Sequence, residues 1–418
     1  MGIFNRSIQK RYMAQSGTEL FSTSWTLHRL SPLYHGQDSK TSLLEARDCI
    51  RAYANRLRDI LTGNVLGGIV QTSTLSPNIG GLDDILARAG ALKECKWANI
   101  PTWSYWNEEH SILEDPDQET SLTLTPDQSA GILISLQYDN ATYKAALLAG
   151  PDGYRHEGDE RPPEGTTFLP LLVTRMPNAL RQSLLSFLSE TFDTRISVLR
   201  LPSSFLCSAF ERYLATLNRT ASRTKKHAAY QTAASKVESR AFIESIMKEV
   251  QLTLSFPPPI STDLMSLNIH IPRDSLSAFY KHGLGSFEVE SNTKSIERDV
   301  PSAPFLKALS EYFDHNLAMK LDLRDFTGRD SSSTGDSKGQ NIRLTKVSCG
   351  AFVLGSEGRI KFLANPGRTI LLNDSDEEEG DGIDVEEREK RLVWKANEEL
   401  LRVLIARATG QWKADNDR

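Results

Sequence analysis

The chain has 418 residues, of which 39% are hydrophobic and 25% are charged, and its formal net charge is −5. The length allows two domains with a substantial core, and the charge balance excludes a whole-protein signal for nucleic acid or membrane. No apolar run approaches the length of a membrane span, and the first 20 residues lack a signal-peptide core. The four cysteines form no CxxC pair, which favours reduced thiols and a cytosolic or nuclear protein.

The N-terminal region is expected to contain a disordered stretch (1–17) and an α/β half (18–150). The aromatic run Phe21–Tyr34 alternates apolar and polar residues with strand period, and Ser31-Pro32 ends it. Leu43–Leu61 has helical spacing after a capping box formed by Ser42 and Glu45. We expect a buried strand at Val65–Val70 next.

A hairpin is predicted for the end of this half, because Gly131–Tyr138 and Thr142–Leu148 are apolar runs joined by Asp139-Asn140. The segment 151–165 is rich in Gly, Pro and charge, so it is expected to be a linker.

A central α/β region is predicted for 166–326. It begins with a strand at Phe168–Thr174, a helix opened by Pro177 and a strand at Arg195–Leu201. Further elements are a helix capped by Ser204, an apolar helical patch at Phe242, Ile246 and Val250, strands at Leu252–Phe256 and Leu264–Ile271, a helix from Phe305 to Leu317 and a strand at Lys320–Phe326.

The C-terminal region follows a flexible linker at 327–340 and covers 341–418. A hairpin is expected from Ile342–Leu354 and Arg359–Leu363, and a final helix over roughly Val385–Ala408. The order of elements predicts an α+β fold, with two α/β halves whose curved sheets are mixed, largely antiparallel and flanked by helices.

Motifs of common enzymes are not found in the sequence. There is no GxSxG elbow, no phosphate-binding GxxxxGK[ST] loop and no HExxH pattern. The segment His282–Gly285 begins like a dinucleotide loop but lacks the third glycine. We therefore expect a protein that is not an enzyme and has no cofactor or metal, while a site built from dispersed residues stays open.

The stretch 219–240 is basic and could contact nucleic-acid phosphates, although a solvated helix face or loop is the simpler interpretation. Its cations are Arg219, Arg223, Lys225, Lys226, Lys236 and Arg240.

The segment Asp374–Glu387 has nine acidic residues and no basic one. Ser375 precedes four acidic residues, a context that favours phosphorylation by casein-kinase-type enzymes. The alternative is a disordered insert that keeps the chain soluble.

The predicted C-terminal hairpin is apolar on both faces around Val347–Leu354. Such a strand is either central in the chain's own sheet or an edge that pairs with a partner. The sequence leaves both alternatives open.

Several segments, in their order and spacing, resemble the fungal CENP-L family of inner kinetochore proteins. They are SWTLHRLSPLYH (Ser24–His35), the Arg-Leu-Arg-Asp helix end before Leu61, Leu169–Leu206 and VSCGAFVLGSEGRIKF (Val347–Phe362). The resemblance covers most of the chain, and none of these segments is chemically specific by itself.

The resemblance implies an α/β fold with curved sheets, and pairing with a CENP-N-like subunit in the constitutive centromere-associated network. It implies that the heterodimer has a basic groove and lies on CENP-A chromatin. It also implies that the CENP-N-like partner is bound through the C-terminal sheet. The candidate partner-binding residues are then Val347, Phe352, Val353, Leu354, Ile360 and Phe362.

The expected function is a non-catalytic inner kinetochore scaffold for chromosome segregation, located in the nucleus at the centromere. The expected partners are a CENP-N-like subunit, other inner kinetochore subunits and centromeric DNA or nucleosomes, with no membrane. The alternative function is an enzyme or nucleic-acid-processing protein.

Overall fold

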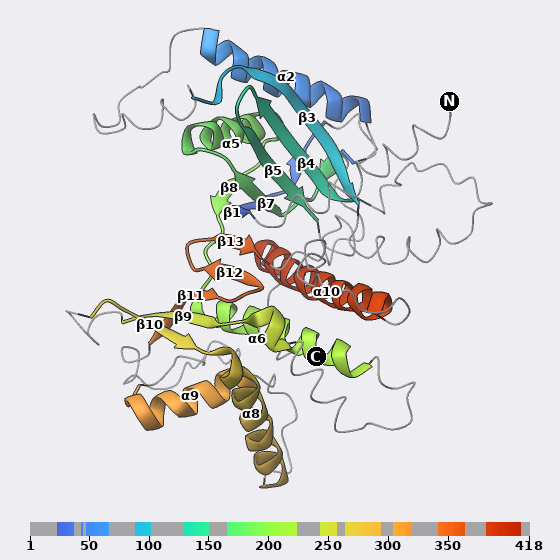
Figure 1. The fold of residues 1–418 in the computed structure, drawn as a ribbon. Helices are drawn as coiled ribbons and strands as arrows, with labels where there is room; N and C mark the ends of the chain where they lie inside the picture. Colours follow the sequence, from blue (N-terminus) through green and yellow to red (C-terminus); the bar gives the residue numbers. More distant parts are fainter. Residues whose placement is uncertain are drawn as a thin grey trace. The chain divides into compact units, whose positions relative to one another are not determined.

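The computed structural model describes residues 23–36, 43–44, 47–66, 88–101, 129–149, 165–223, 243–256, 264–293, 304–319, 342–363 and 382–410. The chain forms two compact units (Figure 1). Unit 1 contains Trp25–Leu199 and Leu404–Thr409, and unit 2 contains Arg200–Val403. Helices and largely antiparallel sheets occur in both units, which confirms the predicted α+β class.

Unit 1 is built on an antiparallel sheet with the strand order β1-β7-β5-β4-β3, and a short strand β8 also pairs with β1. A second, two-stranded sheet joins β2 to β6. The strands are β1 (Ser24–Leu30), β2 (Leu33–Tyr34), β3 (Leu92–Pro101), β4 (Ser129–Tyr138), β5 (Thr142–Leu148), β6 (Thr166–Thr167), β7 (Leu171–Arg175) and β8 (Ile196–Val198).

Two helices, α2 (Arg47–Leu66) and α5 (Asn178–Phe192), complete unit 1. The predicted apolar face of α5 is confirmed, because Leu180, Leu184, Phe187 and Leu188 are all buried. Trp97 of β3 lies between the rings of Tyr53 and Phe187, with ring centroids 6.4 and 6.3 Å away. These aromatic contacts join both helices to one face of the sheet.

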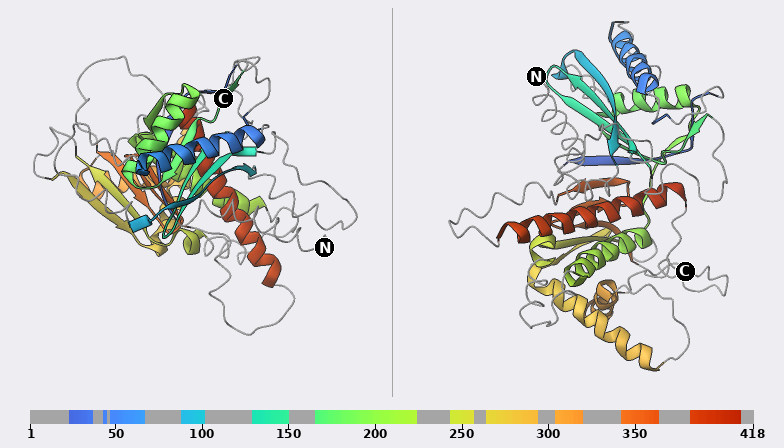
Figure 2. Two further views of the ribbon diagram at one scale, coloured as in Figure 1. Left: turned by 90° about the horizontal axis from the view of Figure 1, so that it is seen from above. Right: turned by 90° about the vertical axis from the view of Figure 1, so that its right-hand side faces the viewer.

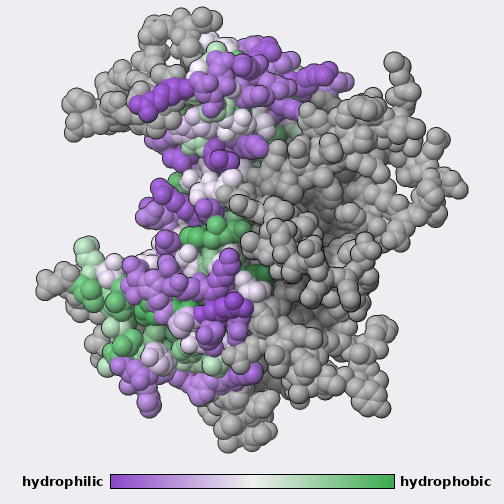
Figure 3. Space-filling view, viewed as in Figure 1, coloured by the Kyte–Doolittle hydropathy of each residue, from purple (hydrophilic) through white to green (hydrophobic). Residues whose placement is uncertain are grey.

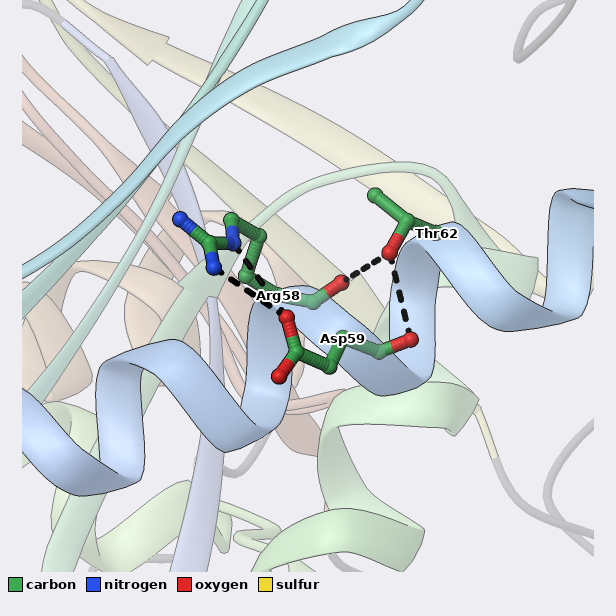
Figure 4. A network of polar contacts seen from close by, with 3 residues as sticks. All are labelled: Arg58, Asp59 and Thr62. Atoms are coloured by element: carbon green, nitrogen blue, oxygen red, sulfur yellow. Dashed lines mark hydrogen bonds and ion pairs between the residues drawn. The ribbon is translucent and has the colours of Figure 1, made fainter.

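The end of α2 differs from the prediction. Val65 and Leu66 were expected to begin a strand, but they continue the helix. Within this helix the Thr62 hydroxyl shares its proton between the carbonyl oxygens of Arg58 and Asp59, at 2.9 and 3.2 Å (Figure 4). The exposed Arg58 side chain also contacts the Asp59 carboxylate at 3.2 Å.

In unit 2, five antiparallel strands pair in the order β10-β9-β11-β12-β13. Its strands are β9 (Val250–Ser255), β10 (Ser266–Ile271), β11 (Arg343–Ser348), β12 (Phe352–Gly355) and β13 (Arg359–Phe362). Its helices include α6 (Ser203–Arg223), α8 (Arg273–Thr293), α9 (Pro304–Leu317) and α10 (Gly382–Thr409), of which the last turn belongs to unit 1.

Helices α6 and α10 lie side by side in the view of Figure 1 and in the right-hand view of Figure 2. Their contact includes a buried hydrogen bond of 3.1 Å from the Tyr213 hydroxyl to Oδ1 of Asn397. Helix α9 packs across α8 through Phe279, whose ring centroid lies 5.8 Å from that of Phe305. At the same crossing, a Cβ atom added to Gly283 would lie 1.8 Å from the carbonyl oxygen of Pro304, so this close approach requires glycine.

Two predictions in unit 2 were wrong. The expected strand Ile342–Leu354 is divided by a turn at Cys349–Ala351 into β11 and β12. Val250, expected on a helix face, begins β9. The segment His282–Gly285, which lacks the third glycine of a dinucleotide loop, lies inside α8. The predicted linker 327–340 and the strand Lys320–Phe326 fall outside the described residues.

Candidate partner-binding sheet

The three strands from Arg343 to Phe362 form a meander inside the sheet of unit 2. Strand β11 pairs with both β9 and β12, and β12 pairs with both β11 and β13. Val347 lies opposite Leu354, and Leu354 lies opposite Ile360. Strand β12 is therefore central in its own sheet, the first of the two alternatives that the sequence left open.

Most of the expected partner-binding residues are core residues of unit 2. Val353 is half-buried. The other five have side chains at most 5% exposed: Val347, Phe352, Leu354, Ile360 and Phe362.

The core behind β12 is made by α6 and α10. The ring of Phe352 meets that of Tyr213 edge-on, with centroids 4.9 Å apart. Burial raises the pKa of Tyr213 well above its ordinary value, so this hydroxyl stays protonated and donates to Asn397. The Cys349 N–H closes the turn before β12 by donating to the Phe352 carbonyl at 2.9 Å, and the Gly350 N–H ties this turn to the Met247 carbonyl at 2.6 Å.

Strand β10 is at the other end of this sheet. It pairs with β9 from Ser266–Ser255 to Ile271–Val250, and among the described strands none pairs with its outer side. Phe256 N donates to the Met265 carbonyl at 3.2 Å, which makes that pair a hydrogen-bonded one. Because such pairs alternate along an antiparallel ladder, the backbone groups of Asn268 and His270 are directed outward.

Apolar side chains gather on the surface of unit 2 around β10 and α9 (Figure 3). Met265 is 79% exposed and Leu264 is 45% exposed, just before β10. On α9, Tyr312 and Leu317 are 49% and 42% exposed. Sequence analysis predicted β10 as a strand but did not identify it as an edge, because strand order depends on pairing partners far along the chain.

Two buried side chains, Glu211 and His28, have strongly shifted pKa values, a property that is also common in enzyme active sites. Burial raises the pKa of Glu211 to about 8, although its carboxylate accepts a 2.6 Å hydrogen bond from the Leu306 backbone N–H at the start of α9. Burial, assisted by Arg181, lowers the pKa of His28 to about 4. Glu211 thus caps a helix in unit 2, whereas His28 is a neutral side chain within the sheet of unit 1.

Other chemical sites can be assessed only for the described part of the chain. There, no group of three or more His, Cys, Asp or Glu side chains could hold a metal ion. No described helix is long and apolar enough to cross a membrane. All four cysteines are free thiols; Cys207 and Cys349 are buried, while Cys49 is exposed.

The basic stretch is described only in part. Positions 219 and 223 lie near the end of α6. Lys225, Lys226, Lys236, Arg240 and Ser375 fall outside the described residues. The acidic segment overlaps α10, which begins at Gly382 rather than near Val385.

Comparison with protein families gives a match over most of the chain. The family model CENP-L, described as Centromere protein L, matches residues 19–409. A search of curated proteins found no match.

Proposed function

The chain belongs to the CENP-L family, and on this premise we propose that it is a non-catalytic scaffold subunit of the inner kinetochore. In this proposal it pairs with a CENP-N-like subunit and helps to assemble the kinetochore on CENP-A chromatin. The match over residues 19–409 carries the proposal, since it includes both units. Membership of this family implies a location at the centromere in the nucleus and a role in chromosome segregation.

The pairing is proposed to use the sheet of unit 2, as the resemblance implies. Because β12 is already paired on both sides, its backbone is not available to a partner strand. The six hairpin residues then support the interface from within the core, and β10 supplies the edge. An outer strand offers a row of backbone donors and acceptors to an incoming strand. Leu264 and Met265 add exposed apolar area beside it.

Asn268→Pro tests this arrangement. Proline removes the outward N–H and places its ring where a partner strand would pair, and such a residue is tolerated at a sheet edge. We expect the variant to fold normally and to bind a co-expressed CENP-N-like subunit at least tenfold more weakly. Dissociation constants from biolayer interferometry would measure the change.

Asn268→Ala is the matched control. It removes the same contact from the Thr253 hydroxyl to Oδ1 of Asn268 (2.8 Å) but keeps the backbone donor. It should bind the partner like the wild type. Equal affinity of the proline variant and the wild type would contradict pairing through β10, while failure of every form to bind would contradict the partner itself.

DNA contact through the stretch 219–240 is a second part of the proposal. Its support is the local excess of cations, together with the chromatin location of the family. Reversing Lys225 and Lys226 to Glu should weaken binding to duplex DNA and reduce the slope of log affinity against log salt by about two. An unchanged slope would show that these lysines are only solvated.

The alternative of an enzyme has less support. Glu211, the described acid with the most strongly raised pKa, hydrogen-bonds to helix backbone, which is a structural role. Turnover that is abolished by one side-chain substitution would favour the enzyme.

A further inference from the structure

The sheet of unit 2 has a second face, which points away from α6. Side chains alternate between the two faces of a strand, and Phe352 of β12 points to α6 through its contact with the ring of Tyr213. Leu354 shares that face and is fully buried, whereas Val353 and Gly355 point the other way and are half-buried. The face that holds Val353 and Gly355 is here called the polar face.

Cations lie on the polar face on both sides of β12. Lys346 of β11 lies opposite Gly355, and Gly355 lies opposite Arg359 of β13. Two residues further along β13, Lys361 lies opposite Val353. Directly paired residues point to the same face of a sheet, so these three cations share the polar face. Lys346 and Arg359 are exposed, and Lys361 is half-buried.

Arg343 of β11 adds a fourth cation. It lies opposite Ser255 of β9, while Lys346 lies opposite Thr253, which is two residues away on β9. Residues two positions apart in a strand share a face, so Arg343 lies on the polar face together with Lys346. Its side chain is exposed.

These charges are available to a ligand. Within the part of the chain that the structure describes, Arg343, Lys346 and Lys361 form no ion pair. Arg359 contacts Glu357 at 4.0 Å, but both side chains are at least 75% exposed, so this pair is weak. Glu357 is also the one acidic residue in the sequence from 342 to 363, which gives these strands a local net charge of +3 (four basic residues minus one acidic).

Strand β12 presents small side chains between the two strands that carry the cations. Among the described atoms, the nearest to a Cβ atom added to Gly355 would be the Arg359 carbonyl oxygen, at 4.0 Å. The packing of the fold therefore does not require glycine at this position. Glycine weakens a strand and often marks a place where another backbone comes close. The half-buried Val353 adds an apolar contact point beside it.

We propose that the polar face docks an acidic, extended segment of a partner protein, which lies along β12. Neighbouring strands are about 4.8 Å apart, so the cations of β11 and β13 are separated by about 10 Å across β12. Side chains of an extended peptide point alternately to its two sides, so consecutive acidic residues reach β11 and β13 in turn. Residues on one side recur about every 6.7 Å, which matches the spacing of Arg359 and Lys361.

The residue types on the polar face favour a peptide over nucleic acid. Single-stranded nucleic acids are bound by stacking their bases on aromatic side chains, whereas β12 offers Val353 and Gly355 here. Proteins with strong salt dependence on duplex DNA contact about six to ten phosphates, more than the four cations of this face. The site uses the face of the sheet rather than its edge, so it is independent of pairing through β10.

Fluorescence anisotropy with the full-length chain, without a CENP-N-like subunit, tests the proposal. The probe is a labelled peptide with four consecutive Glu residues flanked by Gly and Ser, compared with the same peptide with Gln for Glu. We expect the Glu peptide to bind and the Gln peptide to bind at least tenfold more weakly. Failure of the Glu peptide to bind would overturn the proposal and would leave the pairing through β10 untouched.

Two variants test the position of the peptide. Lys346→Glu with Lys361→Glu should lower the affinity for the Glu peptide at least tenfold. Gly355→Val changes no charge and meets no close contact, so it should fold normally, but its side chain should lift the peptide and weaken binding at least fivefold. Wild-type affinity of the Gly355→Val variant would contradict a peptide that lies along β12.

Lys281→Glu with Lys395→Glu is the matched control. Both lysines are exposed, and they lie on α8 and α10, which supply no strand to the polar face. This variant changes the charge of unit 2 equally and should alter the affinity less than twofold, while thermal unfolding should show that all variants remain folded. Equal loss in both double variants would overturn the proposal in favour of a diffuse electrostatic effect.

The other occupants of the polar face give different results. Tighter binding of a 20-base-pair duplex, with the same dependence on Lys346 and Lys361, would overturn the proposal in favour of DNA. Binding of the Glu peptide only after the acidic residues of Asp376–Glu379 are changed to Asn and Gln would overturn it in favour of the chain's own acidic segment.

Discussion

Strands β12 and β10 belong to the same sheet and each contains three apolar residues, yet they differ in exposure. Phe352 and Leu354 of β12 are fully buried, between strands on both sides and in contact with α6. Leu267 and Ile269 of β10 are half-buried, and Met265 just before it is 79% exposed. The comparison shows that a strand's position in the sheet, more than its composition, decides whether its apolar residues stabilise the fold or face a partner.

Phe352→Asp is the strongest test of the central position of β12. Truncating a buried Phe costs about 3–5 kcal/mol, and an unpaired buried charge adds to that cost. Since whole domains are stable by about 5–15 kcal/mol, we expect unit 2 to unfold. Circular dichroism and limited proteolysis would detect this. A folded Phe352→Asp variant would contradict the central position, and Phe352→Leu, costing about 1–2 kcal/mol, is the control.

Glu211→Gln tests helix α6, which packs behind the central strand β12. The pKa of Glu211 is about 8 in the folded chain, whereas the ordinary value for a solvated glutamate is 4.5. Between these values the folded chain holds a proton that the unfolded chain has lost, so stability falls as pH rises. The loss is up to about 1.4 kcal/mol per pH unit over this window.

The Gln variant keeps an oxygen for the Leu306 N–H but does not titrate. Its melting temperature should fall less than that of the wild type between pH 5 and pH 8. Parallel curves for the two proteins would mean that Glu211 is ionised in the fold over this range.

Met265→Asp has the smallest expected effect on stability. The side chain is 79% exposed, so the free energy of unfolding should change by less than about 0.5 kcal/mol. Affinity for a CENP-N-like subunit should nevertheless fall, because the apolar area beside β10 is reduced. Chemical denaturation and binding measured on the same preparation would separate the two effects, and a loss of stability similar to that of a core variant would contradict the edge position.

Local patterns in the sequence predicted much of the fold. Helical spacing identified α5, α6 and α9, and Asp139-Asn140 identified the β4–β5 hairpin. Helix α8 was missed because Gly283 and Gly285 disfavour a helix, although the close approach of Pro304 requires glycine at position 283. The turn between β11 and β12 was missed because it also depends on a tertiary contact of a glycine. A Cβ atom added to Gly350 would lie 2.5 Å from the Ile246 carbonyl oxygen.

The candidate sites were less accessible to sequence analysis. The candidate partner-binding sheet exists because β9, β11, β12 and β13 pair in that order, which depends on pairings between distant segments. The outer position of β10 likewise depends on β11 pairing with β9 rather than with β10. The family resemblance, by contrast, was visible in short segments and is confirmed by the match over residues 19–409.

The hydrogen bond from Tyr213 to Asn397 joins residues separated by 184 positions. Helix α10 supplies buried Val393, Ala396 and Leu400 to the same core. During translation, α10 leaves the ribosome well after α6 and the strands it covers, so the core between them cannot close until α10 has been made. A premature stop codon that removes α10 would leave a nascent chain with an open core, a natural substrate for chaperones and proteolysis.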